Sequence, residues 1–176
     1  WHEANAAALA HVEATGAAYF HPFADPFVVA GQGTVALEIL DQLPQVDTIL
    51  VAMGGGGLIS GVATVVKALK PSVRVVGIEA AGCPVLLRAL EAGENRGLDA
   101  VTTSVATMAC ARTEDTIFEI VRDTVDEIVL VEDAEMLDAA RWLWFEMGLA
   151  ADLSGAAAIA ALRARRLTLA PGERVC

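Results

Sequence analysis

Four consecutive glycines are the residues of this sequence best suited to binding a ligand. Gly54, Gly55, Gly56 and Gly57 follow a continuous apolar run and precede a helical pattern that opens with Leu58. Because glycine loses the most conformational entropy on folding, four in a row indicate that the backbone must come close to a partner and direct several N–H groups at it. A strand-to-helix loop adds the positive end of the helix dipole to those donors. The chemistry that this pattern favours is the binding of a phosphate group.

Two common phosphate-binding loops do not match this segment. A P-loop requires Gly-Lys-Ser/Thr after its first glycines, and Leu58-Ile59-Ser60 stand there instead. The GxGxxG spacing of dinucleotide-binding folds is also missing, although four glycines mimic part of it. A tight turn that lets the helix pack closely on the sheet remains the alternative to a ligand site, because glycine serves that purpose too.

The cysteines and histidines do not indicate a metal site. They form no CxxC pair, show no zinc-ligand spacing and lie scattered along the chain. An odd number of cysteines in a chain of this size fits reduced thiols in the cytoplasm better than a disulfide framework. These residues are Cys83, Cys110, Cys176, His2, His11 and His21.

Composition and charge exclude several other functions. The chain has 176 residues and a net charge of −11, so its acidic surface would repel nucleic-acid phosphates, and we expect no nucleic-acid partner. The 55% of apolar residues can build one sizeable core. No apolar run approaches the roughly 20 residues of a membrane span, and no signal peptide is recognisable. We therefore expect a cytoplasmic protein that does not bind a membrane.

The order of the patterns predicts how the glycines are positioned. Apolar runs alternate with helical patterns, which is typical of βα units around a largely parallel sheet. Strands are expected at 48–53, 73–78 and 127–131, with a short strand at 17–20 and another beginning at 173–176. Helices are expected at 3–13, 34–43, 58–69, 84–91, 116–122, 133–147 and 154–163, the last two capped by Asp133 and Ser154. Both ends of the chain read as cuts within a longer protein.

Several short segments, spread in order along the chain, match one pattern. They are His21-Pro22-Phe23, Ala30-Gly31-Gln32-Gly33-Thr34, Gly54-Gly55-Gly56-Gly57-Leu58, Val76-Gly77-Ile78-Glu79 and Ser154-Gly155-Ala156-Ala157. Together they resemble the threonine/serine dehydratase group of fold-type-II pyridoxal-phosphate (PLP) enzymes, which includes serine racemase. The resemblance implies a three-layer αβα fold with a mostly parallel sheet, similar to tryptophan synthase β and incomplete here. It also implies that residues 1–25 end a small domain, and that residues 26–176 belong to the large PLP-phosphate-binding domain, truncated at both ends.

The resemblance also implies roles for single residues. The backbone N–H groups of residues 54–58 would hold the PLP phosphate, in agreement with the glycine pattern. Glu79 stands where some relatives hold a divalent cation, but Val85 replaces their second carboxylate, so no metal is expected and an exposed strand-end acid is the alternative. Asp152 replaces a glutamate that lies near the cofactor ring in relatives, and it could reach that ring or cap the following helix. His21 lies in a loop on the substrate side in relatives, with a structural role as its alternative, because nothing local supplies a partner.

The lysine that binds the cofactor aldehyde is missing from this chain. Its only lysines are Lys67 and Lys70, in the helix after the glycine loop. At about 1.5 Å per residue, Lys67 lies roughly 13–15 Å along that helix from the loop, so neither fits the role of the Schiff-base lysine. In relatives that lysine is near the N-terminus, which corresponds to chain before Trp1. The catalytic residues are therefore unknown within this chain, apart from the possible role of Asp152.

For the parent protein, the resemblance implies a lyase. The expected reaction is α,β-elimination of L-threonine or L-serine to a 2-oxo acid and ammonia, with a small amino acid as substrate and a homo-oligomer as the assembly. A PLP-dependent amino-acid racemase or a β-replacement enzyme is the alternative on the same fold, because these reactions share the removal of the α-proton. A non-catalytic phosphate-binding α/β module is the alternative of a different class, and the missing lysine supports it.

Overall fold

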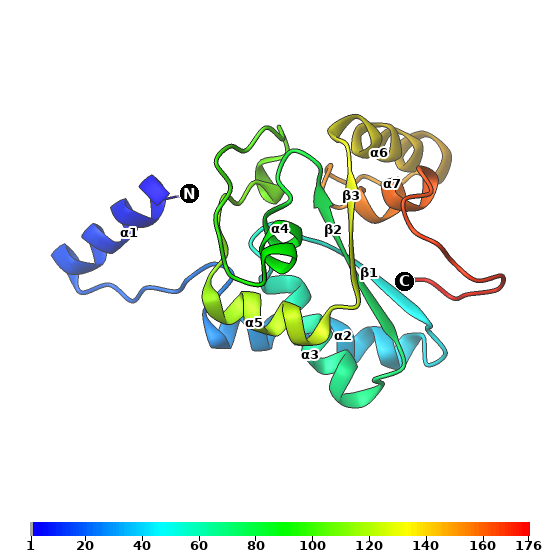
Figure 1. Cartoon of the computed structure of the whole chain (residues 1–176), viewed down its shortest axis with the longest axis horizontal. Coiled ribbons are helices and arrows are strands. Elements are labelled where there is room, and N and C mark those ends of the chain that lie inside the picture. The colour runs from blue at the N-terminus through cyan, green and yellow to red at the C-terminus, as the bar shows by residue number, and fades with distance from the viewer. Residues whose placement is uncertain (1) are drawn as a thin grey trace.

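The computed structural model describes residues 2–176, which alternate between helices and strands along the chain (Figure 1). The strands are β1 (Thr48–Ala52), β2 (Arg74–Ala80) and β3 (Glu127–Val131). The helices are α1 (His2–Thr15), α2 (Pro26–Gln42), α3 (Gly57–Leu69), α4 (Val85–Ala92), α5 (Asp115–Thr124), α6 (Asp133–Met147) and α7 (Ala157–Arg163), with a short 3₁₀ turn at Ala106–Met108. The predicted alternation of apolar strands and helical patterns is confirmed.

The sheet has the order β1-β2-β3 with parallel pairing throughout. Parallel strands covered on both faces read as continuous apolar runs, and Val75, Val76 and Ile78 of β2 are fully buried. The end of the chain runs beside the outer edge of β1, where Cys176 N donates to Thr48 O at 2.9 Å and Leu50 N donates to Cys176 O at 2.8 Å. This pairing agrees with the strand expected to begin at residues 173–176.

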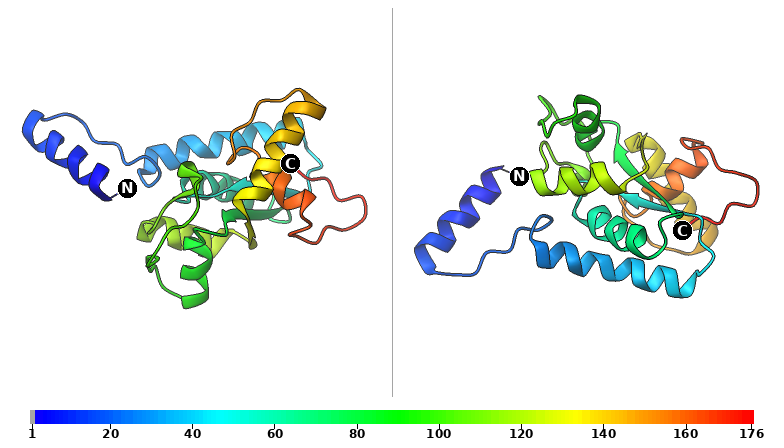
Figure 2. Two further views of the ribbon diagram at one scale, coloured as in Figure 1. Left: turned by 90° about the horizontal axis from the view of Figure 1, so that it is seen from above. Right: turned by 60° about the horizontal axis from the view of Figure 1, so that its bottom comes forward.

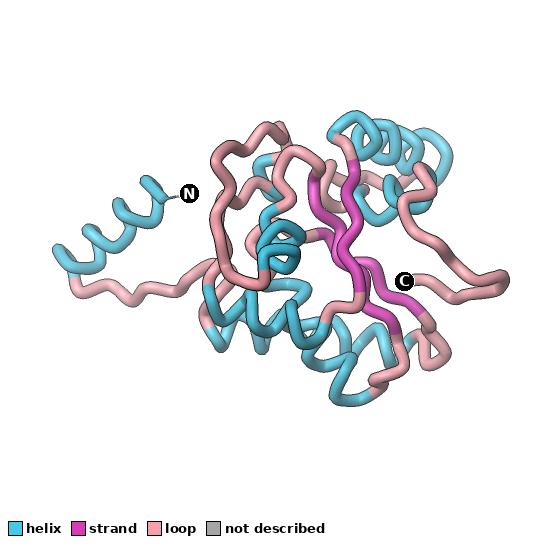
Figure 3. Tube along the Cα trace, in the orientation of Figure 1, coloured by secondary structure: helices cyan, strands magenta, loops and turns pink. Residues whose placement is uncertain are grey.

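Helices cover both faces of the sheet and make three layers (Figures 1 and 3). One core, under α2, α3, α4 and α5, contains Ile49, Val75 and Ile117. The other, under α6 and α7, contains Val76, Ile78 and Met136. The three-layer αβα arrangement expected from the family resemblance is therefore confirmed for the described residues.

Helix α2 begins well before the predicted start at residue 34, and the reason lies in its glycines. Asp25 caps the helix by accepting hydrogen bonds from Phe27 N at 2.8 Å and Val28 N at 3.3 Å. The helix then runs through Gly33, because that glycine faces α3: a Cβ there would lie 2.9 Å from Val65 Cγ2. Glycine marks a close contact between two helices at this position, whereas the sequence pattern indicated a helix start.

Three other local predictions are corrected by the structure. Residues 17–20 form a loop, because among residues 2–176 no strand lies beside them to pair with. Helix α6 is capped by Glu132, while the Asp133 carboxylate accepts hydrogen bonds from Thr103 Oγ1 and Ser104 N, both at 2.6 Å. Helix α7 begins at residue 157, and Ser154 lies in the turn before it.

Helix α1 lies apart from the three layers and joins them through residues 16–25 (Figure 2). The connection is hydrogen-bonded to this helix by Gly16 N, which donates to Val12 O at 2.8 Å, and by the Tyr19 hydroxyl, which donates to Asn5 Oδ1. Within residues 2–176, none of the helices combines the length and the apolar character that crossing a membrane would require. The division into a small-domain end at 1–25 and a large domain at 26–176 stays a prediction.

Candidate functional site

The glycine loop connects β1 to α3 at the carboxyl end of a parallel strand. Gly56 is the N-cap of α3 and has φ +90°, a left-handed conformation that glycine adopts without strain. Among the described residues, the N–H groups of residues 54–59 donate no hydrogen bond. The first N–H groups of a helix always lack intrahelical partners, and here none is supplied by a side chain. The loop therefore presents a row of unused donors at the positive end of the helix dipole.

A cavity of about 300 Å³ lies at this loop. Its position beyond the carboxyl end of a strand is where α/β proteins bind their ligands. Residues 54–58 line it together with Pro22, Phe23, Gln32, Ala52, Met53, Thr107, Met108 and Ser154. No lysine, arginine or histidine belongs to this lining, so the charge of a phosphate would be met by backbone N–H groups and by the helix dipole.

Packing also requires the glycines, independently of any ligand. A Cβ on Gly54 would lie 2.6 Å from Thr107 O, and one on Gly57 would lie 2.3 Å from Phe23 O. A Cβ on Gly55 would lie 2.6 Å from the Phe23 ring. These contacts are with the segments at Phe23 and Thr107 and not between the helix and the sheet, so they are a different packing reason for the glycines, which coexists with the unused donors. The donors, more than the number of glycines, are the observation that points to a ligand.

Both lysines form hydrogen bonds with neighbouring residues at the end of α3 that is remote from the glycine loop. Lys67 Nζ donates to Val73 O at 2.9 Å and to Asp126 Oδ2 at 2.6 Å, and Lys70 Nζ donates to Pro44 O at 2.6 Å. These contacts join α3 to the amino-terminal ends of the strands. Each ammonium group thus has a structural partner at the amino-terminal end of the strands, whereas the cavity lies at their carboxyl-terminal end.

Glu79 is fully buried, so the interpretation as an exposed strand-end acid is wrong. Its two carboxylate oxygens accept hydrogen bonds from Leu86 N at 2.8 Å and Leu87 N at 3.0 Å, which satisfies free N–H groups at the start of α4. Burial raises the pKa of this carboxyl to about 7, against the lowering effect of those hydrogen bonds. Within residues 2–176, no group of three or more His, Cys, Asp or Glu side chains is placed to hold a metal ion.

Asp152 closes the turn that precedes α7. Its carboxylate accepts hydrogen bonds from Gly155 N at 2.6 Å and from Ser154 Oγ at 2.9 Å. Ser154 lines the cavity at the glycine loop, whereas Asp152 lines a separate hollow beside Trp144 and Phe145. These contacts stabilise the turn, whereas the N-cap of α7, Ala156, receives no side-chain hydrogen bond. A role of Asp152 near the cofactor ring stays a prediction.

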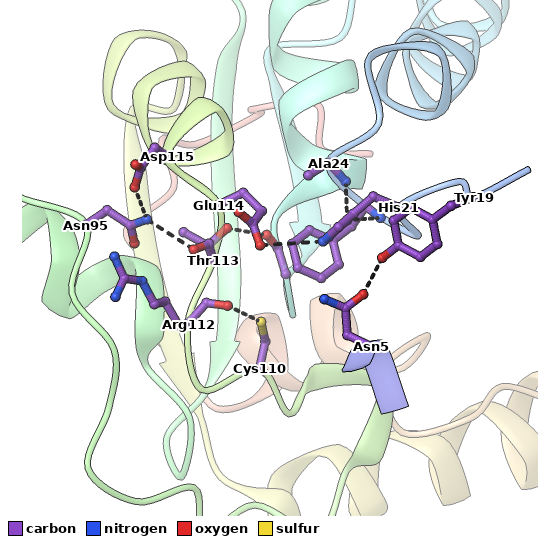
Figure 4. A network of polar contacts seen from close by, with 12 residues as sticks. Asn5, Tyr19, His21, Ala24, Asn95, Cys110, Arg112, Thr113, Glu114 and Asp115 are labelled. Atoms are coloured by element: carbon purple, nitrogen blue, oxygen red, sulfur yellow. Dashed lines mark hydrogen bonds and ion pairs between the residues drawn. The ribbon is translucent and has the colours of Figure 1, made fainter. Parts of the chain in front are cut away.

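A polar network beside the loop was not predicted from the sequence (Figure 4). His21 Nδ1 accepts a hydrogen bond from Ala24 N at 3.0 Å, and His21 Nε2 lies 3.5 Å from Glu114 Oε1. Thr113 Oγ1 donates to Gly55 O at 2.7 Å. Glu114 and Thr113 are far in the sequence from His21 and Gly55, so no local signal could have identified these two contacts. His21 does have a partner, contrary to the expectation drawn from its neighbours.

The fold and the loop together define a class of protein. A parallel sheet covered on both faces, with a glycine loop and a helix N-terminus at the carboxyl end of a strand, is an arrangement in which α/β proteins bind phosphate-bearing ligands. The family described as pyridoxal-phosphate dependent enzymes matches residues 1–176. The chain belongs to this family, whose cofactor is PLP, and the unused N–H donors at the cavity fit the phosphate of that cofactor.

Individual relatives agree with this assignment. The chain is 42% identical to an L-threonine ammonia-lyase of Geobacter sulfurreducens over 99% of its own length and 43% of that protein. It is 35% identical to a serine racemase of Arabidopsis thaliana, over 94% of this chain and 50% of that protein. The structure of a processed threonine deaminase from Solanum lycopersicum matches with a TM-score of 0.87 and 31% identity, over 95% of this chain and 49% of that one. The chain thus spans about half the length of the relatives that it matches.

Proposed function

We propose that the complete protein carrying this chain is a PLP-dependent ammonia-lyase that acts on L-threonine or L-serine. The row of unused N–H groups at the head of α3, in the cavity at the glycine loop, is the observation that carries the proposal. Similarity to L-threonine ammonia-lyases at 42% and 40% identity supports elimination as the reaction. The products would be a 2-oxo acid and ammonia.

The contribution of this chain is to hold and orient the cofactor. The N–H groups of residues 54–58 would bind the phosphate, and the dipole of α3 would favour its negative charge. When bound, PLP supplies an electron sink for the negative charge that develops at the α-carbon of the amino acid. Because Lys67 and Lys70 are engaged at the far end of α3, the lysine that attaches the cofactor would come from outside this chain.

A serine racemase is the second candidate, because relatives of that name reach 40% identity. Elimination and racemisation begin with the same removal of the α-proton, so the phosphate site does not separate them. Incubating the complete protein with L-serine and with L-threonine, and measuring ammonia, 2-oxo acid and D-amino acid, separates them directly. Ammonia with 2-oxo acid supports the lyase, and D-serine without ammonia supports the racemase. A cofactor-loaded protein that forms neither contradicts both.

The phosphate site itself is tested by deleting one donor. Leu58 is in the first turn of α3, where its N–H enters no helical hydrogen bond, so proline removes the donor without breaking a hydrogen bond of the helix. In Leu58→Pro we expect the affinity for PLP to fall about tenfold, since a hydrogen bond to a charged group contributes about 1.5–3 kcal/mol. Leu58→Ala keeps the donor and is the matched control. Affinity for pyridoxal, which lacks the phosphate, should be equal in the two variants.

A further inference from the structure

Phe23 packs directly against the glycine loop. A Cβ on Gly55 would lie 2.6 Å from the Phe23 ring, and a Cβ on Gly57 would lie 2.3 Å from Phe23 O. The residue lines the cavity at the glycine loop and is only partly buried. One side chain and its own carbonyl thus cover two of the four glycines.

His21 determines where Phe23 lies. Its Nδ1 accepts hydrogen bonds from Ala24 N at 3.0 Å and from Phe23 N at 3.4 Å, which folds residues 21–24 into a turn. The imidazole edge packs against the Phe23 ring, with centroids 4.5 Å apart and planes at 88°. On its other side, Nε2 lies 3.5 Å from Glu114 Oε1 (Figure 4). The imidazole of this turn therefore faces the residues just before α5.

The stretch of chain before α5 that contains Glu114 also contacts the glycine loop. Thr113, next to Glu114, donates its hydroxyl to Gly55 O at 2.7 Å. A Cβ on Gly56 would lie 2.7 Å from Ile117 Cγ2 in α5, so this glycine has no free space either. Residues 113–117 and residues 21–24 together enclose the glycine loop.

We propose that Phe23 and His21 are positioning residues that fix the glycine loop in its phosphate-binding conformation, His21 acting through Phe23. Four adjacent glycines have large conformational freedom, and a ligand that had to order them would lose affinity by that cost. Contacts from Phe23 supply the order before the phosphate arrives. The inference rests on the proposed phosphate site at residues 54–58 and adds the residues that shape it.

The test is the ratio of the pyridoxal and PLP dissociation constants of the complete protein, because this ratio isolates the contribution of the phosphate. We expect Phe23→Ala and His21→Ala each to lower the ratio by about tenfold or more. His21→Asn should lose less than His21→Ala, because Asn Oδ1 replaces Nδ1 as the acceptor for the turn while the ring contact with Phe23 is lost. Phe20→Ala is the matched control: Phe20 lies in the same connection, is 65% exposed and faces no glycine of the loop.

The outcomes separate this inference from the function on which it rests. If the wild-type protein binds pyridoxal as tightly as PLP, the phosphate site itself is wrong. If the wild type prefers PLP and Leu58→Pro loses that preference, while Phe23→Ala and His21→Ala keep it, only the positioning role fails. An equal loss in Phe20→Ala, or in His21→Asn, also overturns it. Should Phe23→Ala not fold, Phe23→Leu, which retains much of the volume, is measured with the same ratio and the same expected direction.

Discussion

At the scale of single residues, Glu79 shows how burial converts a surface residue type into a structural one. The carboxyl has no exposed area, caps α4 through two hydrogen bonds and has a pKa of about 7. An unfolded chain gives the group its ordinary value of 4.5. The folded state therefore binds the proton more tightly, and the stability that protonated Glu79 provides is complete below pH of about 4.5. It is lost as the pH rises through about 7.

The raised pKa of Glu79 predicts that the stability of the wild type depends on pH in a way that the stability of Glu79→Gln does not. The amide stays neutral, so the free energy of unfolding of the wild type should fall relative to that of the variant between pH 4.5 and pH 7. The predicted relative change is about 3 kcal/mol, from 1.36 kcal/mol per pKa unit. Urea unfolding at a series of pH values measures it. Glu119→Gln, at an exposed position of α5, should run parallel to the wild type. Parallel curves for Glu79→Gln would contradict the raised pKa.

Thr113 leads to a second prediction at the same scale. Its hydroxyl is buried and donates to Gly55 O, so Thr113→Val keeps the shape and leaves a carbonyl without its donor. We expect the free energy of unfolding to fall by about 1–3 kcal/mol, the cost of an unsatisfied buried group. Thr113→Ser retains the hydroxyl and should lose less. A Val variant as stable as the wild type would mean that the Gly55 carbonyl finds another donor.

At the scale of elements, glycines bring α2 and α3 into direct backbone contact. A Cβ on Gly61 would lie 2.3 Å from Val29 O, so Gly61→Ala must push the two helices apart. The expected loss is about 1–3 kcal/mol of unfolding free energy, typical of overpacking. Gly31→Ala is the matched control in α2, because a Cβ there meets nothing within 4 Å. Alanine is also the better helix former, so that variant should gain up to about 1 kcal/mol. Equal melting temperatures for the two variants would contradict the contact.

The same elements explain which parts of the structure could be predicted from the sequence. Three consecutive local signals predict β1, the loop and α3: an apolar run, four glycines and a helical period. The structure has these elements where they are expected. The start of α2 could not be predicted, because Gly33 looks like a helix breaker unless its contact with Val65 is known. His21 and Phe23 belong to a segment that resembles the family. The contacts of His21 with Glu114 and of Phe23 with Gly55 join segments far apart in the chain. The loop is therefore predictable from the local sequence, whereas the segments that enclose it are not.

At the scale of the whole molecule, the two ends of α3 have different structural roles. The amino-terminal end carries the unused donors of the cavity, and the carboxyl-terminal end is tied to the sheet by Lys67, which contacts Asp126, and by Lys70. Asp126 also accepts a hydrogen bond from Val75 N at 2.7 Å, so this end joins a helix to two strands. The length of the helix separates the only two lysine amines of this chain from the phosphate site.

This separation predicts where the cofactor is attached. In the complete protein loaded with PLP and reduced with borohydride, peptide mapping should find the cofactor on a lysine outside residues 1–176. Lys67→Arg with Lys70→Arg keeps both positive charges, so the attached amount should equal that of the wild type. Thermal unfolding of this double variant is the control for the contacts at the end of α3. Cofactor attached to Lys67 or Lys70, and lost in the double variant, would contradict the assignment of the cavity at the other end of α3.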